Sequence, residues 1–343
     1  MIVTDRSSRR PETKGADVRS SLRPGFDRPN IPYRPWFAGL LLLLFATGCT
    51  TAPRPVDARE LRILDGRDGT PLEWSTFVAR TGDVDVVLFG EEHDDPFAHA
   101  LQRELVRSMV AERDRVALSM EMFERPEQTT LDRWSSGEID TATMVRETGA
   151  NGWGGETGWW TWYQPILDVA RASGTPIIAA NAPRNVVRRA RLEGYDVLDD
   201  LPEDRRTQFD LPLSLDQGTY WEKFRDTMRE FRGDEVEDEE IVATFRSQMV
   251  WDSTMAHSMA RALDRSEIDR LIHLAGRFHV DHDGGTAREF RRLRPDRSML
   301  TVSCVRAGLD RRTLSAEDLD RADVVIYTPL ESDRVVPSEV TAP

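Results

Sequence analysis

Six short apolar runs, separated by segments with helical periodicity, constrain the fold of this chain more than any other feature. The runs cover residues 85–90, 115–123, 175–183, 270–276, 299–305 and 323–330, and they are rich in Val, Ile and Leu. Amphipathic stretches such as 96–112 and 184–193 follow them along the chain. Strands that are apolar on both faces and alternate with helices form parallel sheets covered on both sides. We therefore predict an α/β fold with a mainly parallel sheet flanked by helices.

A long segment between the third and fourth runs, residues 195–265, contains no convincing strand. Its apolar residues recur at helical spacing, first at Phe224, Met228 and Phe231 and then at Phe245 and Met249. We predict that this segment is an inserted helical subdomain packed over one end of the sheet. The α/β domain that contains it is expected to span residues 61–343.

The N-terminal segment carries a targeting signal. Arginines precede an apolar run from Trp36 to Ala46, and small residues then lead to Cys49 in "FATGC". The run is shorter than the roughly 20 residues that span a bilayer, so we predict an export signal over residues 1–48. "FATGC" resembles a bacterial lipobox, which implies lipidation (palmitate) of Cys49 and a tether over residues 49–60. An uncleaved anchor and an ordinary signal peptide are the alternatives.

Charge and cysteine content narrow the class of protein further. The formal net charge is −14, which argues against a nucleic-acid partner. Without residues 1–48, 38 basic and 56 acidic residues remain, a balance of −18. If Cys49 carries lipid, only Cys304 is left, so the exported domain has no internal disulfide and depends on its core.

Polar residues follow four of the apolar runs directly. In parallel sheets, ligands bind beyond the carboxyl ends of the strands, where the following loops converge. We therefore expect these polar residues to face one common cavity at one edge of the sheet. They are Glu91, Glu92 and His93 after the first run, Glu121 and Glu124 after the second, Asn181 after the third, and Arg277, His279 and His282 after the fourth.

Two kinds of chemistry fit this set of residues. In the first, His93, Glu121 and His279 bind a divalent metal and leave one position open for water, with Glu91 or Glu92 as the base. In the second, no metal is needed, because His93 takes the proton from water or substrate and a neighbouring glutamate holds its tautomer. The sequence leaves both open.

The loop after the first run also has a structural interpretation. Its carboxylates could cap the following helix, where the helix dipole favours negative charge. We expect Asp94 and Asp95, directly before Pro96, to be such caps. His99 and Gln102 lie one turn apart on that helix and share a face, so they could hold the loop in place.

An aromatic segment at 151–170 contains four tryptophans and Tyr163. Such a cluster suits a flat apolar ligand or anchors a loop on the core. Tyr163 is a candidate haem ligand, because a phenolate can bind ferric haem. The stripe of Trp251, Met255 and Met259 is typical of core packing.

Five segments, in this order, resemble the ChaN-like haem-binding uptake lipoproteins. They are "GEEHDDPFAHALQ", "LSMEMFERPEQTTLDRW", "WWTWYQPILDVARASGTPIIAANAPRNVV", "RSQMVWDSTMAHSMA" and "HLAGRFHVDHDGG", within residues 84–295. The chain is more distantly similar to Tiki-type and erythromycin-esterase-like proteins.

The resemblance implies haem binding linked to iron uptake, in a lipoprotein anchored to the outer membrane and facing the periplasm. It also implies that a tyrosine holds the haem and that two protomers share paired haems. Tyr163 is the first candidate for that tyrosine, with Tyr195 or Tyr220 as alternatives. His282 is an additional histidine relative to the family pattern.

The same resemblance implies a rival function. Gly90-x-x-His93 matches the Gly-x-x-His signature of the Tiki-like relatives, which use it with glutamates for hydrolysis. A purely structural envelope lipoprotein is a third hypothesis, but it leaves the grouped histidines and glutamates without a purpose.

Overall fold

The computed structural model describes residues 52–338 apart from 113–114 and 234. The predicted signal over residues 1–48 and the lipidation site Cys49 lie outside the described residues. These described residues belong to one compact unit by their internal contacts. Within the described ranges, no helix is both long and apolar enough to cross a membrane.

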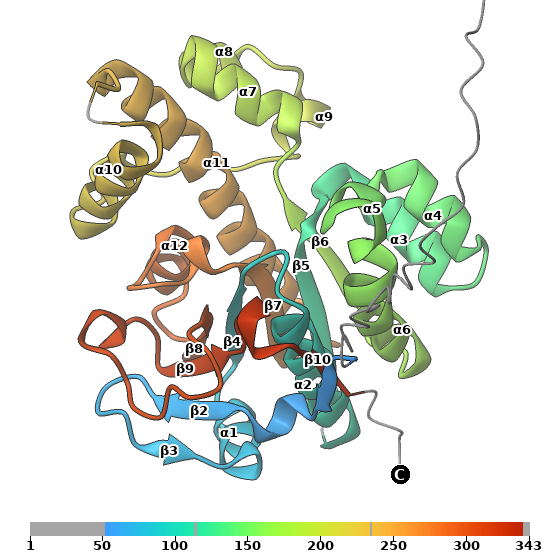
Figure 1. The fold of residues 1–343 in the computed structure, drawn as a ribbon. Coiled ribbons are helices and arrows are strands. Elements are labelled where there is room, and N and C mark those ends of the chain that lie inside the picture. The colour runs from blue at the N-terminus through green and yellow to red at the C-terminus, as the bar shows by residue number, and fades with distance from the viewer. Residues whose placement is uncertain (1–51, 113–114, 234, 339–343) are drawn as a thin grey trace, which may run out of the picture. The chain divides into compact units, whose positions relative to one another are not determined.

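An eight-stranded sheet in the order β3-β2-β9-β8-β4-β7-β5-β6 forms the centre of this unit (Figure 1). The six strands from β9 to β6 pair in parallel, and they correspond to the six apolar runs. The prediction of a mainly parallel α/β fold is therefore confirmed. The strands of this sheet are β2 (Arg62–Asp65), β3 (Pro71–Leu72), β4 (Val86–Glu91), β5 (Val116–Glu124), β6 (Ile177–Asn181), β7 (Arg270–Gly276), β8 (Met299–Arg306) and β9 (Val324–Thr328).

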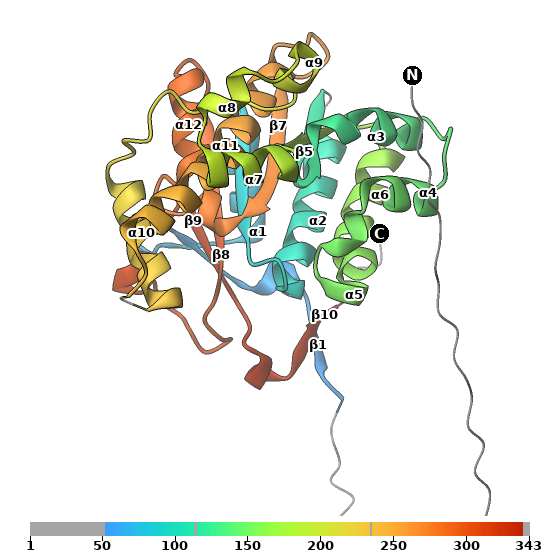
Figure 2. The ribbon, with the colours of Figure 1, turned by 90° about the horizontal axis from the view of Figure 1, so that it is seen from above.

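Helices cover both faces of the sheet (Figures 1 and 2). Helices α1, α2 and α6 pack on one face, and α11 and α12 pack on the other. The helices are α1 (Trp74–Gly82), α2 (Pro96–Glu112), α3 (Gln128–Ser135), α4 (Thr141–Thr148), α5 (Gly155–Gly158), α6 (Gln164–Ala172), α7 (Arg184–Glu193), α8 (Asp196–Asp199), α9 (Glu203–Arg206), α10 (Thr219–Arg232), α11 (Asp238–Leu263) and α12 (Gly285–Leu293). A π-helical turn, η4 (Trp159–Tyr163), precedes α6, and a 3₁₀ turn, η5 (Arg277–His279), follows β7.

The alternation of side chains along β4 decides which helices its last residues meet. Val87 and Phe89 belong to the core beneath α2 and α6, whereas Val86 packs with α11 and α12. Since successive residues of a strand point to opposite faces, Glu91 at the end of β4 points to the α2 face. Leu118 and Met120 of β5 also face α2, whereas Ala117 packs with α11 and α12, so the alternation directs Glu121 to the α11 face. The strand is irregular after Met120, and Phe123 returns to the core beneath α2.

The segment predicted as a helical insertion, residues 195–265, contains α8, α9, α10 and α11, and no strand is assigned among its described residues. Figure 2 shows α10 and α11 on the same side of the sheet as α7 and α12. The second half of α11 is not a separate layer, because Ala256, Met259 and Leu263 pack directly on the sheet.

Four short strands are absent from the sequence prediction. β2 and β3 form an antiparallel extension of the sheet, and β2 pairs antiparallel with β9. A separate two-stranded sheet joins β1 (Arg54–Val56) to β10 (Val335–Pro337) in parallel. These strands have two to four residues, too few for hydrophobic periodicity to reveal them.

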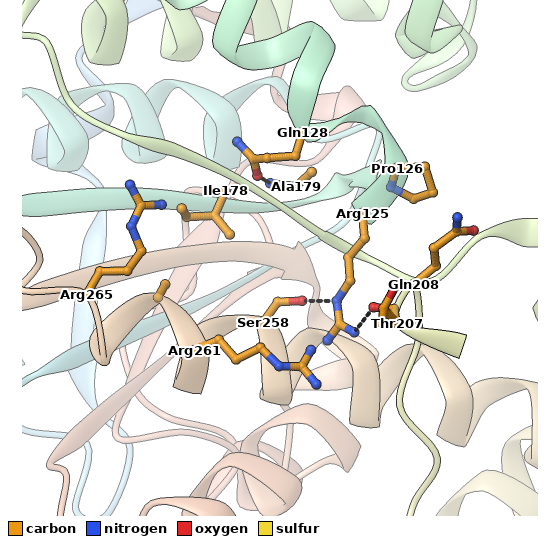
Figure 3. Close-up of a pocket in the computed structure, with 11 residues that line it drawn as sticks. Arg125, Pro126, Gln128, Ile178, Ala179, Thr207, Gln208, Ser258, Arg261 and Arg265 are labelled. Atoms are coloured by element: carbon orange, nitrogen blue, oxygen red, sulfur yellow. Dashed lines mark hydrogen bonds between the residues drawn. The ribbon is translucent and has the colours of Figure 1, made fainter. Parts of the chain in front are cut away.

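The outer edge of β6 is covered by one side chain, shown in Figure 3. The Gln128 amide donates to the Ile177 carbonyl at 2.7 Å and accepts from the Ala179 amide at 2.8 Å, so it takes the place of a further strand. A cavity of about 560 Å³ lies beside this edge, and Arg125 in its wall donates to the Ser258 hydroxyl at 2.8 Å. This cavity contains none of the predicted site residues.

Candidate functional site

The carboxylate of Glu91, at the end of β4, is buried and held by three side chains. It accepts hydrogen bonds from the Tyr163 hydroxyl at 2.5 Å and the Gln102 amide at 2.5 Å, and it lies 2.9 Å from His93 Nδ1. Burial by itself opposes ionisation of Glu91, but the nearby His99 and His93 outweigh it and hold the pKa of Glu91 below its usual value. Glu91 is therefore a buried anion with nearly all of its hydrogen-bonding capacity used.

His93 presents its other ring nitrogen to the site. Its side chain is 40% exposed, and its ring edge contacts Trp153 with the ring centroids 5.0 Å apart. Burial lowers the pKa of His93, but the hydrogen bond to Glu91 and the charge of Glu121 raise it above the usual value overall. With Nδ1 directed at Glu91, Nε2 is the nitrogen left for a proton, a substrate or an iron atom.

The π-helical turn at Trp159–Tyr163 positions the tyrosine beneath Glu91. π-helical turns add a residue to a helix and are frequent at functional sites. His99 supports the arrangement from α2, because its ring stacks on Trp162 at an interplanar angle of 11° and its Nε2 lies 3.2 Å from the His93 carbonyl. The structure thus places His99 and Gln102 in the role proposed for them, holding the loop after β4.

A second buried carboxylate, Glu121 of β5, lies near His279. The distance from Glu121 Oε1 to His279 Nε2 is 3.5 Å, and Oε2 accepts from the Gly276 amide at 2.7 Å. On its other side, His279 Nδ1 lies 2.6 Å from Asp252 of α11. Burial opposes the charge on His279, but Glu121 and Asp252 raise its pKa to about 10. Despite burial, His279 and His93 lower the pKa of Glu121 to about 2, so an imidazolium lies between two carboxylates.

Asp252 was missed in the sequence analysis, and it is the centre of this second group. Its carboxylate accepts from the Tyr220 hydroxyl and the Thr286 hydroxyl, both at 2.8 Å. A β-carbon on Gly285 would lie 2.0 Å from Asp252 Oδ2, so only glycine fits at that position. The available signal was an aspartate inside the apolar stretch "QMVWDSTMAHSMA" of a helix.

The two groups meet at Gly276. A β-carbon placed on this glycine would lie 3.1 Å from His93 Nε2 and 3.7 Å from Glu121 Oε2. The structure therefore brings residues from β4, β5 and the turn after β7 together at one end of the sheet. A small cavity of about 40 Å³, lined by Glu121, Asn181 and Trp153, adjoins them and has room for water.

Other predicted residues have different roles. Glu92 turns to Arg277, 3.2 Å away, and not to His93. Asn181 donates to the Glu121 carbonyl at 2.9 Å and joins the ends of β5 and β6. Asp95 accepts from the Phe97 amide at 2.9 Å, as expected of a helix cap.

Asp94 and His282 also lie apart from the Gly276 meeting point. Asp94 pairs with Arg306 at 2.9 Å instead of capping the helix. His282 lines a separate cavity.

The structure does not support the predicted metal site of His93, Glu121 and His279. Both nitrogens of His279 face carboxylates, and these carboxylates raise its pKa, which favours the protonated ring over a metal ligand. Across the described residues, no group of three or more His, Cys, Asp or Glu is arranged to hold a metal ion.

The three tyrosines considered as haem ligands all use their hydroxyls within the protein. Tyr163 is fully buried and donates to Glu91, Tyr220 donates to Asp252, and Tyr195 donates to the Arg246 carbonyl at 2.9 Å. Burial raises the pKa of each phenol, which opposes formation of a phenolate. In this conformation, none of the three phenols is free to bind iron.

Residues 77–290 match the family model described as "Haem-binding uptake, Tiki superfamily, ChaN". No curated protein sequence matches the chain significantly. Among solved structures, a ChaN of Campylobacter jejuni, described as binding haem cofacially, is similar at a TM-score of 0.60 and 16% identity, covering 79% of this chain and 98% of that one. The type III effector HopBA1 has a TM-score of 0.45 and 14% identity, with 79% and 98% covered. An erythromycin esterase mutant has a TM-score of 0.40 and 13% identity, with 72% and 77% covered. At these identities, the comparison with the Campylobacter protein shows the fold alone.

We predict that the Glu121–His279 pair makes the free energy of unfolding depend on pH in a specific window. His279 has an ordinary pKa of 6.5 and a folded pKa of about 10, so its stabilising effect is complete below pH 6.5 and is lost as pH rises to about 10. Glu121 falls from 4.5 to about 2, so its effect is present above pH 4.5 and is lost in stronger acid. Chemical denaturation should show that His279→Gln lowers the free energy of unfolding by about 3 kcal/mol between pH 4.5 and pH 6.5. The difference from the wild-type protein should shrink as the pH rises toward 10.

The matched control is His257→Gln, which changes a histidine of α11 whose pKa is lowered by burial. The loss in free energy of unfolding caused by His257→Gln should show no maximum between pH 4.5 and pH 6.5. An equal effect of His279→Gln at pH 6 and pH 10 would mean that His279 is not a cation in the folded protein.

Proposed function

The chain belongs to the ChaN family of haem-binding uptake proteins in the Tiki superfamily, and from this we propose that it binds haem with His93 as the iron ligand. One observation carries the choice of ligand. His93 is the half-exposed imidazole at the strand ends, and Glu91 fixes its Nδ1 so that Nε2 is presented.

The donor set around His93 fits an iron porphyrin. Imidazoles that bind metals usually donate their other nitrogen to a carboxylate, which fixes the tautomer and raises the basicity of the ligand. Glu91 supplies that carboxylate, and Tyr163 and Gln102 hold it in turn. Bound haem would supply an iron centre, and His93 is the residue that would hold it. Trp153, which contacts the His93 ring, offers an aromatic surface beside it.

Tyr163 remains the alternative ligand named by the family resemblance. To bind iron, its phenol would have to lose both its proton and its hydrogen bond to Glu91. We favour His93 because it keeps its hydrogen bond to Glu91 when it binds, and because an imidazolium gives up its proton far more readily than a buried phenol.

We propose further that the protein is a lipid-anchored envelope protein linked to haem and iron uptake, facing the periplasm from the outer membrane. The lipobox-like "FATGC" and the family resemblance support this location. A homodimer that shares haem between protomers is part of the same proposal.

A second function, hydrolysis, is favoured by the convergence of two histidine–carboxylate groups at Gly276. In this proposal, His93 takes a proton from water through Nε2, and Glu91 stabilises the imidazolium that forms. His279, whose two nitrogens face Glu121 and Asp252, would hold this second group in position beside His93 and would not contact the substrate. No metal is needed for these steps.

We predict that haemin titrated into the protein produces a Soret shift that depends on His93. His93→Ala should abolish the shift, and Glu91→Gln should weaken binding by about 10–100-fold. Binding needs the neutral imidazole, so it should decline as pH falls through the raised pKa of His93, and Glu91→Gln should move that midpoint to lower pH.

Tyr163→Phe distinguishes the two ligands, because it should leave the Soret shift in place. His257→Ala, at a histidine remote from the strand ends, is the matched control. Loss of the shift in Tyr163→Phe with retention in His93→Ala would assign the iron to the tyrosine.

We predict that hydrolysis, if tested on a panel of esters with haem-free protein, falls by about 10²–10⁴-fold in His93→Ala. Glu121→Gln should also reduce turnover, because it removes the contact that orients His279. Circular dichroism checks that both variants fold. A wild-type protein that turns over none of the panel contradicts this function and leaves the haem proposal untouched.

We predict that Cys49→Ser releases the protein from the membrane fraction of expressing cells and removes incorporation of labelled palmitate. The control is Cys304→Ser, at the buried cysteine of β8, which should keep both properties. Unchanged membrane association of Cys49→Ser would argue for an uncleaved anchor.

A further inference from the structure

A second cavity, distinct from the strand-end site, lies between α10 and the turn that follows β7. Its volume is about 540 Å³, within the range of small-molecule sites. Figures 1 and 2 show α10 beside the first half of α11. The cavity is lined by Tyr220, Lys223, Asp226, Thr227, Glu230 and Phe231 of α10, by Arg277, Phe278, Asp281 and His282 after β7, and by Arg321.

The arginines of this cavity are already neutralised. Asp281 accepts from Arg277 at 2.9 Å and from Arg321 at 2.6 Å. Arg277 also contacts Glu92, and Arg321 also contacts Asp318. These pairs form the wall and leave little charge for a ligand.

Lys223 is different, because no hydrogen bond or ion pair joins it to any other described residue. Asp226, one turn away, pairs with Arg225 at 3.1 Å, and Glu230 lies at the exposed rim. Burial and the charge of Arg321 lower the pKa of Lys223, even though Asp281 acts in the opposite direction. Lys223 is an exposed side chain, and among the described residues its ammonium group has no hydrogen-bonded counter-ion, since Asp281 acts on it only from a distance.

The sequence sets Lys223 apart as well. The chain has 46 basic residues, and only Lys14 and Lys223 are lysines. Arginine forms forked, fixed pairs with carboxylates, whereas lysine is a compact charge on a flexible stem. The single lysine in a wall whose arginines are already paired is therefore suited to contact the negative charge of a ligand.

The rest of the wall is aromatic. The rings of Tyr220 and Phe278 lie 5.9 Å apart between centroids, and Phe231 at the rim is 84% exposed. An exposed phenylalanine beside two packed rings favours an apolar or aromatic ligand. Tyr220 also donates to Asp252, so the cavity adjoins the group that holds His279.

We propose that this cavity binds a small organic molecule that carries one anionic group on an apolar or aromatic body, with Lys223 contacting the anion. The ligand's charge supplies the counter-ion that Lys223 lacks, and its body packs against Tyr220, Phe278 and Phe231. This proposal does not depend on haem binding or on hydrolysis at the strand ends.

The test measures protection of Lys223 by benzoate against formaldehyde and cyanoborohydride, on the full chain. The Lys223 amine attacks the aldehyde carbon, water leaves to give an imine, and hydride from cyanoborohydride reduces the imine to a stable methylamine. Peptide mass spectrometry separates the product at Lys223 from that at Lys14. We expect excess benzoate to slow labelling of Lys223 at least about fivefold in a saturable manner, and the neutral analogue benzamide to have no such effect.

Two variants test the wall. Phe231→Ser, at an exposed side chain that the fold does not need, should raise the benzoate concentration for half-protection several-fold. Arg229→Gln removes a cation of the same helix that pairs with Asp238 and does not line the cavity, and it should change nothing. Labelling of Lys223 that benzoate does not slow relative to Lys14, or that benzamide slows equally, overturns the proposal.

Discussion

The burial of two carboxylates at the ends of β4 and β5, the two parallel strands that flank β7, is the constraint on which this site depends. Glu91 and Glu121 leave the sheet on opposite faces, so each meets a different layer of helices. A buried charge is costly unless it is paired and hydrogen-bonded. Each carboxylate is accordingly matched by a histidine, and each histidine–carboxylate pair recruits a second layer, Tyr163 and Gln102 in one case and Asp252 in the other.

This arrangement gives the two histidines different characters. His93 has one nitrogen fixed and one presented, whereas His279 has both nitrogens directed at carboxylates. A ligand for iron or a base must offer a lone pair, which only His93 can do. This difference is the reason that we propose His93, and not Tyr163, as the iron ligand.

The sequence predicts the parallel core well, because runs such as 85–90 and 270–276 are long, apolar and bounded by helical segments. It also places Glu91, His93, Glu121 and His279 at one sheet edge, because the ends of parallel strands must meet there. It misses Asp252, because that residue lies in a helix whose Met255 and Met259 are core, as expected. Nor does any sequence pattern indicate the π-helical turn at Trp159–Tyr163. This turn directs the Tyr163 hydroxyl toward Glu91, so the hydroxyl is already hydrogen-bonded within the protein.

The short parallel pair of β1 and β10 has a mechanical consequence. The Arg54 amide donates to the Arg334 carbonyl at 3.0 Å, and the Ser338 amide donates to the Val56 carbonyl at 2.8 Å. Tension applied through the chain before residue 54 would therefore act on the β1–β10 pair before it reached the eight-stranded sheet. Three-residue strands are joined by few hydrogen bonds, so this pair would separate under tension first, while the strand-end carboxylates keep their partners.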